Sequence, residues 1–273
     1  MKQTQLLLLF SFSILLAINP EPSLSQGVAA ASLGLEGTAL IDGYGLAQNP
    51  ATLALYKKSE IGIQHFNRFR IGNWNDIAIY GITNTGRQTV LSAGYTMQGF
   101  PGYQTHSILL GGGIKCGKRM SVGLATGIAA TSIIEQSQKN NIGIEGKAGI
   151  TYAINSKLLF GLTVNNPQDL LKDLSENNSN ISSGLKYCPS SVFTCCIEII
   201  QSAEKANAGI GIEYKPAEKI ACRVGFHGAS RQSSIGIGFN YSRLIINVAV
   251  LNHPYLGLST GLSLSYCIKK TDE

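Results

Sequence analysis

Two short motifs in the chain could carry catalytic chemistry. Residues 257–261 match the G-x-S-x-G pattern of a nucleophilic serine. Such a serine needs a strand-to-helix turn and a histidine later in the chain, but Ser259 lies in an alternating segment and the last histidine is His253. Residues 112–118 resemble a phosphate-binding loop, but Arg119 stands where serine or threonine should bind magnesium, and no helix follows. We predict no catalytic residue and no enzyme.

The histidines and cysteines do not form a recognisable metal site. The spacing of the four His and six Cys fits no common ligand pattern and no small disulfide scaffold. A bridge from Cys188 to Cys195 or Cys196 is one possibility in an oxidising compartment. The preferred interpretation is that the cysteines are small apolar fillers. We therefore predict neither a metal nor a cofactor.

The composition is that of a strand-rich protein. Only 14% of residues are charged and 31 are glycine, and the mean hydropathy is mildly apolar at +0.11. The net charge is +6, with Lys and Arg scattered along the sequence, which gives little support for nucleic-acid binding. After residue 20 no apolar run is long enough to span a bilayer as a helix.

The first 25 residues are typical of a secretory signal peptide. Lys2 precedes an apolar stretch over residues 6–18, and residues 23–25 form a small-x-small cleavage site. A membrane anchor is the weaker alternative, because the apolar run is short and turns polar at Asn19.

From residue 59 onward, apolar and polar residues alternate with the period of a β-strand. Residues 142–152 place isoleucines and Tyr152 on one face, and Glu145, Lys147 and Thr151 on the other. A soluble sandwich and a membrane barrel both produce this pattern. The polar faces favour the barrel, because they are small and carry few charges, whereas a face exposed to water would be densely charged.

We predict an all-β fold, a transmembrane antiparallel barrel of about fourteen strands over residues 59–268. The expected strands are 59–71, 74–84, 87–98, 104–115, 119–134, 140–153, 157–165, 179–188, 190–202, 206–215, 219–228, 233–241, 243–252 and 256–268.

The connections and the tyrosines supply two tests of this prediction. Every second connection is short, whereas the others include residues 99–103, 135–141 and 165–180, as expected for periplasmic turns and external loops. Five tyrosines fall on the apolar face near the ends of alternate strands, where a membrane interface prefers them. This predicted interface girdle is Tyr152, Tyr187, Tyr214, Tyr241 and Tyr266.

Four charged residues are predicted to face the lumen, namely Glu145, Lys147, Glu213 and Arg223. They could line a solute path. Alternatively, Glu213 and Arg223 form a cross-strand ion pair that stiffens the wall, which is the interpretation we favour.

A short helix is predicted in front of the barrel. Asn49 is a suitable N-cap, Pro50 suits the first helical position, and Leu53 supplies an apolar side chain. Gly43 and Gly45 are expected to let the lead-in bend. The helix is expected to continue to the positive charges at residues 57–58.

The segments 35–43 and 48–54, with its Asn-Pro-Ala-Thr-Leu-Ala, resemble the start of mature FadL-type outer-membrane proteins, and more specifically the PorV/PorQ branch of Bacteroidetes. Residues 251–259 and 164–167 are similar to later segments of that branch. The resemblance implies that residues 26–58 form a lumenal hatch in a multi-pass barrel of a Gram-negative, Bacteroidetes outer membrane.

The same resemblance implies two functions. The PorV/PorQ branch implies a barrel that serves type IX secretion and binds secretion-system subunits or secreted cargo. The wider FadL resemblance implies the alternative, passive passage of small hydrophobic molecules. Beyond outer-membrane lipid, and with no nucleic acid expected, the sequence names no cargo, solute or partner.

Overall fold

The computed structural model describes residues 26–85, 88–133, 141–171, 179–202 and 205–270. The predicted signal peptide, residues 1–25, lies outside the described residues, as does most of the predicted loop 135–141.

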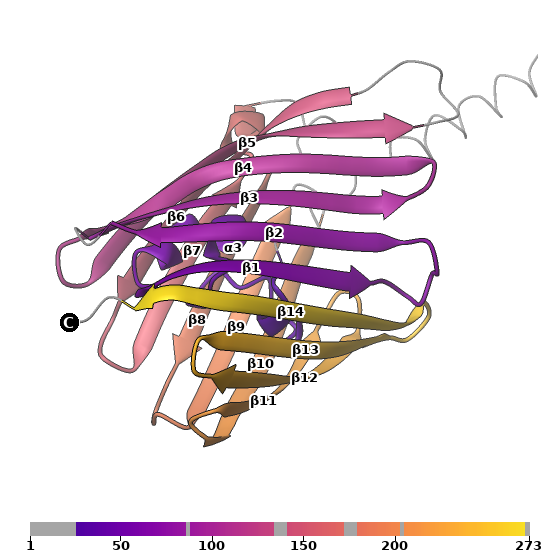
Figure 1. The fold of residues 1–273 in the computed structure, drawn as a ribbon. Coiled ribbons are helices and arrows are strands. Elements are labelled where there is room, and N and C mark those ends of the chain that lie inside the picture. Colours follow the sequence, from indigo (N-terminus) through magenta and orange to yellow (C-terminus); the bar gives the residue numbers. More distant parts are fainter. Residues whose placement is uncertain (1–25, 86–87, 134–140, 172–178, 203–204, 271–273) are drawn as a thin grey trace, which may run out of the picture.

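Fourteen antiparallel strands close into one barrel, in which every strand pairs with its sequence neighbours and the first pairs with the last (Figure 1). The predicted all-β barrel of fourteen strands is confirmed, and the largest deviation is at the end of the first strand, predicted at residue 71 and observed at Asn67. The strands are β1 Lys58–Asn67, β2 Asn75–Asn84, β3 Thr89–Phe100, β4 Tyr103–Cys116, β5 Met120–Ile133, β6 Asn141–Ala153, β7 Leu158–Asn165, β8 Asn180–Tyr187, β9 Phe193–Ser202, β10 Ala206–Ala217, β11 Ile220–His227, β12 Gln232–Tyr241, β13 Leu244–His253 and β14 Gly257–Lys270.

The two faces of the wall have opposite polarity. On β12, Ile235 is 60% exposed on the outside, whereas the adjacent Ser234 is 2% exposed on the inside. The same alternation of exposed aliphatic and buried small or polar side chains recurs around the barrel. An apolar exterior with a buried polar interior suits a wall that faces lipid.

In the described part of the chain the helices are short, and all but one precede the barrel. They are α2 Val28–Ala31, α3 Gly45–Gln48, α4 Pro50–Leu53 and the 3₁₀ helix η2 Pro167–Leu171. The predicted short helix begins at Pro50 as expected, but it ends at Leu53 instead of continuing to residues 57–58, and a second short helix, α3, precedes it. Lys57 and Lys58 therefore lie beyond the helix, and Lys58 begins β1. No helix among the described residues is long and apolar enough to cross a membrane.

The connections differ between the two rims. One rim, which we call the short-turn rim, has the turns 85–88, 117–119, 154–157, 188–192, 218–219 and 242–243, and β1 begins and β14 ends there. The other, the loop rim, includes the longer connections 68–74 and 166–179. The longer loop expected at residues 99–103 is wrong. It is a two-residue turn, made possible by the left-handed φ of Gly99 and Gly102 (130° and 113°).

Candidate functional site

Residues 26–57, which we call the lumenal segment, lie inside the barrel (Figure 1). Of these residues only Lys57 is exposed. Helix α2 packs against β12, β13 and β14, α3 against β3 and β4, and α4 against β4, β5 and β6. The segment thus contacts strands from widely separated parts of the wall, and it makes the barrel interior the candidate site.

Asn49 organises the corner between α3 and α4. Its side-chain oxygen accepts a hydrogen bond from the Ala51 N–H (3.0 Å), so Asn49 caps α4 as predicted, with Pro50 in the first turn. Its side-chain nitrogen donates to the carbonyls of Thr38 (2.7 Å) and Ile150 (3.3 Å). One buried amide therefore ties together two parts of the lumenal segment and strand β6.

The end of the lumenal segment packs on an apolar patch of the wall. Leu46, Leu53 and Tyr56 form one buried cluster with four inward-facing side chains of β2 to β5, which are Ile82, Val90, Leu109 and Ala125. Leu53 is completely buried. Burying side chains of this size contributes about 1.5–3 kcal/mol each, so this cluster holds the end of the segment near the point where it enters β1.

Elsewhere the segment lies on inward-facing glycines. A Cβ on Gly225 of β11 would lie 1.9 Å from the Leu33 carbonyl carbon, and one on Gly123 of β5 would lie 2.3 Å from the Ala51 nitrogen. A Cβ on Gly161 of β7 would lie 2.3 Å from the Thr38 carbonyl oxygen. Glycine in a strand marks a place where another backbone approaches closely. These glycines therefore make room for the lumenal segment.

Glu198 of β9 anchors the middle of the segment. The carboxylate is 2% exposed and accepts hydrogen bonds from the backbone N–H groups of Gly37 (3.0 Å) and Thr38 (3.3 Å) and from the Thr38 hydroxyl. The φ of Gly37 is 101°, a left-handed conformation that glycine adopts without strain, and it aims these donors at one point. A buried charge stabilised by several donors is a strong attachment.

Glu60 of β1 anchors the end of the segment. This carboxylate is 1% exposed and accepts hydrogen bonds from the hydroxyls of Tyr56 (2.5 Å) and Tyr80 (3.0 Å). The Cys267 thiol lies 3.7 Å away as a third donor. Two of the attachment points of the segment are thus buried carboxylates on the wall.

Gly43 lies in the turn before α3 and Gly45 begins α3, but neither has a left-handed φ. The glycines of the segment with left-handed φ are Gly34 and Gly37. A Cβ on Gly43 would lie 1.9 Å from a Glu60 carboxylate oxygen, and one on Gly45 would lie 2.6 Å from the Thr52 hydroxyl oxygen. Both positions are glycine because neighbouring side chains approach closely.

The four predicted lumen-facing charges lie in two separate places. Arg223 Nε is 2.6 Å from Glu213 Oε2 across the β10–β11 pair, and Arg223 also donates to Asn247 (2.9 Å). On the other side, Glu145 accepts from Ser107 (2.7 Å), and Lys147 donates to Asn165 (2.6 Å). The structure brings Glu213 and Arg223 together but does not join them to the other pair.

The five predicted girdle tyrosines all point outward near the short-turn rim. Their exposed fractions run from 42% for Tyr152 and Tyr266 to 69% for Tyr241. The Lys219 ammonium lies 5.6 Å from the Tyr241 ring centroid, and Arg243 donates to the Tyr266 hydroxyl (3.4 Å).

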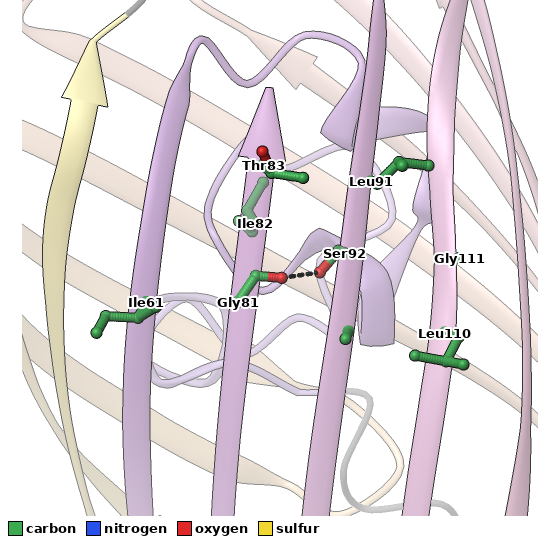
Figure 2. A pocket seen from close by; sticks show the side chains of 9 residues that line it. Ile61, Gly81, Ile82, Thr83, Leu91, Ser92, Leu110 and Gly111 are labelled. Carbon is green, nitrogen blue, oxygen red and sulfur yellow. Dashed lines mark hydrogen bonds between the residues drawn. The ribbon is translucent and has the colours of Figure 1, made fainter. Parts of the chain in front are cut away.

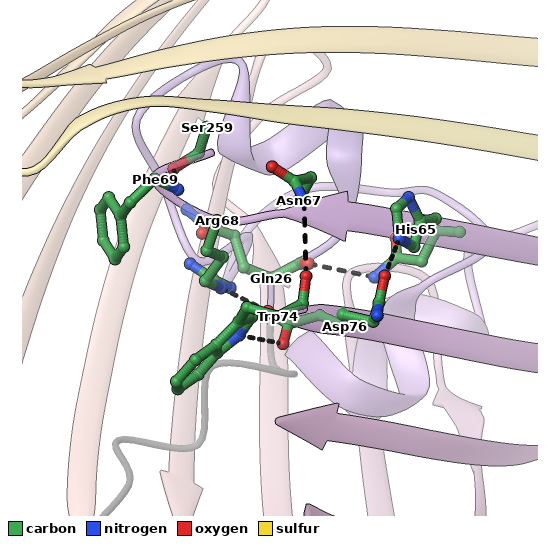
Figure 3. A network of polar contacts seen from close by, with 10 residues as sticks. Gln26, His65, Asn67, Arg68, Phe69, Trp74, Asp76 and Ser259 are labelled. Carbon is green, nitrogen blue, oxygen red and sulfur yellow. Dashed lines mark hydrogen bonds and ion pairs between the residues drawn. The ribbon is translucent and has the colours of Figure 1, made fainter. Parts of the chain in front are cut away.

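At the loop rim, residues 68–74 fold back onto the strands (Figure 3). Asp76 is 1% exposed, forms an ion pair with Arg68 and accepts from the Trp74 indole N–H (2.9 Å). The Phe69 N–H donates to the Ser259 hydroxyl (2.9 Å), so the serine of the rejected nucleophile motif serves to hold this loop.

A shallow hollow of about 660 Å³ lies on the wall over β1 to β4 (Figure 2). Ile61, Leu91 and Leu110 border it, and small residues such as Gly81 and Ala93 form its floor. These apolar side chains are outward-facing, so the hollow belongs to the outer surface of the barrel.

Comparison with known proteins was informative only at the level of structure. No family model and no curated protein matches the chain. Among solved structures, the toluene transporter TbuX of Ralstonia pickettii matches with a TM-score of 0.70 at 12% identity, covering 90% of this chain and 100% of that one. The chain has a FadL-like fold.

Further structures support this fold. The Pseudomonas putida toluene transporter TodX matches with a TM-score of 0.67 at 10% identity, covering 88% of this chain and 96% of that one. A Pseudomonas aeruginosa FadL homologue gives 0.63 at 10% identity, covering 89% and 98%. Of these proteins, TbuX and TodX are toluene transporters. They give no support to the PorV/PorQ branch, to type IX secretion or to a Bacteroidetes origin.

Two residues central to the site escaped prediction. Neither Glu198 nor Glu60 is among the candidate site residues predicted from the sequence. Their partners in the lumenal segment cannot be read from the sequence, because Glu198 is 160 residues from Thr38. The available signal was their type, since a carboxylate is a rare choice for the inner face of a strand rich in isoleucine.

Proposed function

We propose that the protein is an outer-membrane channel for small hydrophobic molecules and that the lumenal segment is its gate. The observation that carries the proposal is the lumenal segment itself, which fills the interior of a barrel with a FadL-like fold. Solutes that cross such a barrel need this segment to move or to leave space beside it.

The polar lumen is compatible with this function. Taken alone, inward-facing Glu and Lys would favour partner binding over the passage of apolar molecules. However, Glu198 and Glu60 accept hydrogen bonds from donors of the chain itself, and Glu213 forms an ion pair with Arg223. The surface of the segment that contacts the wall is largely apolar. The polarity of the wall therefore says little about the solute.

The contacts that hold the lumenal segment inside the barrel are non-covalent and can break and re-form. The six cysteines are all free, so no disulfide ties the segment to the wall. Two carboxylates, a few amide contacts and three apolar clusters hold it. Each of these attachments is reversible.

The test is transport by the full chain in proteoliposomes. We expect a monoaromatic hydrocarbon such as toluene to enter faster than in protein-free vesicles, while a charged solute of similar size does not. Glu198→Ala, which removes the central anchor, should raise the hydrocarbon flux. Ile199→Ala, on the outer face of the same strand, is the matched control.

A second readout guards against a variant that fails to fold. Folded barrels are recognised by their heat-modifiable migration on gels, and only preparations that pass this check enter the flux assay. Wild-type flux equal to that of empty vesicles, together with no change in Glu198→Ala, would contradict the proposed function.

A further inference from the structure

Positive charge gathers at the short-turn rim, although Lys and Arg are scattered in the sequence. Six exposed cations, which we call the basic rim, lie where the chain enters β1 and in four of the short turns. They are Lys57, Lys118, Arg119, Lys157, Lys219 and Arg243. The impression from the sequence that these charges do not cluster is therefore wrong in three dimensions, because alternate turns return to the same rim.

The basic rim has little negative charge near it. Among the residues that the structure describes, Glu218 is the exposed acid in these turns. At the loop rim the exposed Lys and Arg of the described connections are Arg70, Lys205 and Arg231, and Arg68 is paired with Asp76. Within the described residues, the short-turn rim thus carries more exposed cations than the loop rim.

The basic rim also lies at a definite depth relative to the predicted girdle. Lys219 stands over the Tyr241 ring at 5.6 Å, and Arg243 donates to the Tyr266 hydroxyl at 3.4 Å. Exposed tyrosines next to an apolar band mark the level of lipid headgroups. Cations in contact with these rings lie at the same level, where phosphate groups of lipids are found.

We propose that the basic rim binds the phosphate headgroups of anionic phospholipids in the leaflet that covers the short-turn rim. The inference rests on the membrane location in the proposed function, but not on the identity of the solute. Lys and Arg near an anionic membrane surface gain favourable energy that falls off within a Debye length. The even spread of the cations over the turns allows several lipids to bind around the circumference.

The experiment measures lipid selectivity of the full chain reconstituted in phosphatidylcholine vesicles with and without phosphatidylglycerol. Spin-labelled phosphatidylglycerol and phosphatidylcholine report the fraction of each lipid held at the protein surface. We expect a preference for phosphatidylglycerol of up to about fivefold per headgroup position, and its loss at high salt because exposed charges are screened.

A matched pair of triple variants locates the effect. Arg119→Gln, Lys157→Gln and Arg243→Gln together should abolish most of the preference. Arg70→Gln, Lys205→Gln and Arg231→Gln remove the same charge from the loop rim and should leave the preference unchanged.

Two outcomes overturn the proposal in different ways. If the wild-type barrel inserts but holds both lipids equally, or if the two triple variants behave alike, the basic rim does not select phospholipids and an acidic protein becomes the better partner. That result leaves the proposed channel intact. Failure to insert into either kind of vesicle overturns the membrane location and this inference together.

Discussion

The two faces of the barrel wall are built from alternate residues of the same strands, yet they are constrained in different ways. The outer face needs only to be apolar, so isoleucine, leucine, valine and phenylalanine serve in many positions. The inner face must fit one particular backbone, because Gly123, Gly161 and Gly225 each approach a different part of the lumenal segment. Mutations can therefore test the fit of the inner face to the lumenal segment separately from the apolar character of the outer face.

The largest difference between the faces is expected from Gly225→Val. Its side chain would overlap the Leu33 backbone, where a Cβ has only 1.9 Å of space. Overpacking of this kind costs about 3 kcal/mol or more, so the lumenal segment should no longer pack in its place inside the barrel. Hydrogen exchange of peptides from residues 26–57 should rise strongly, and ion conductance should appear in planar bilayers.

The control for this variant lies on the other face. Gly81 points outward into the hollow of Figure 2, and the nearest atom to its Cβ is the Ile61 Cγ2 at 3.9 Å. Gly81→Val should leave exchange and conductance at wild-type values. Equal effects of the two substitutions would show that the inner glycines do not accommodate the segment.

The second prediction concerns Asp42, an acid of the lumenal segment. Burial inside the barrel raises its pKa from 3.8 to about 6; the nearby Glu60 carboxylate adds to this, while the Tyr44 N–H and Arg223 oppose it. A carboxyl whose pKa is raised by burial stabilises the lumenal segment in its packed position inside the barrel below pH 3.8. This stabilisation is lost as the pH rises through about 6.

The free energy that holds the lumenal segment inside the barrel should therefore fall by about 2–3 kcal/mol from acid to neutral pH, since each pKa unit corresponds to about 1.4 kcal/mol. Hydrogen exchange of the segment measured across this range should show the change, and Asp42→Asn should remove most of it. A pH response that survives in Asp42→Asn would assign the effect to another group.

The difference between the faces also explains how much could be predicted from the sequence. Alternation identified all fourteen strands, because the outward-facing side chains obey a simple rule with period two. The same strands gave no reason for Gly123 or Gly225 in particular, since their partners are distant in sequence. Asn49 and Pro50 were recognised because helix capping is local, whereas the Glu198 anchor required the folded chain.

The third prediction removes the Glu198 anchor. Glu198→Ala leaves the N–H groups of Gly37 and Thr38 buried without their acceptor. An unsatisfied buried donor costs about 1–3 kcal/mol. We therefore expect the free energy that holds the lumenal segment inside the barrel to fall by about 2 kcal/mol. Ile199→Ala, on the outer face of the same strand, should leave exchange of residues 36–48 unchanged. Identical exchange in both variants would argue that the apolar clusters alone hold the segment.

The smallest effect is expected from the inner ion pair of Arg223 and Glu213, whose hydrogen bonds and ion pairs join it to other residues of the wall. Arg223 and Glu213 face each other directly across β10 and β11, and Glu213 keeps a second partner in Lys215 at 3.1 Å. Cross-strand charge pairs contribute about 0.2–1 kcal/mol. A double-mutant cycle of Arg223→Gln and Glu213→Gln, read by heat-modifiable migration on gels, should give a coupling energy in that range without raising exchange of the lumenal segment. A coupling well above it, or a released segment, would show that this pair belongs to the gate, and the division between wall-stiffening and segment-holding residues would have to be redrawn.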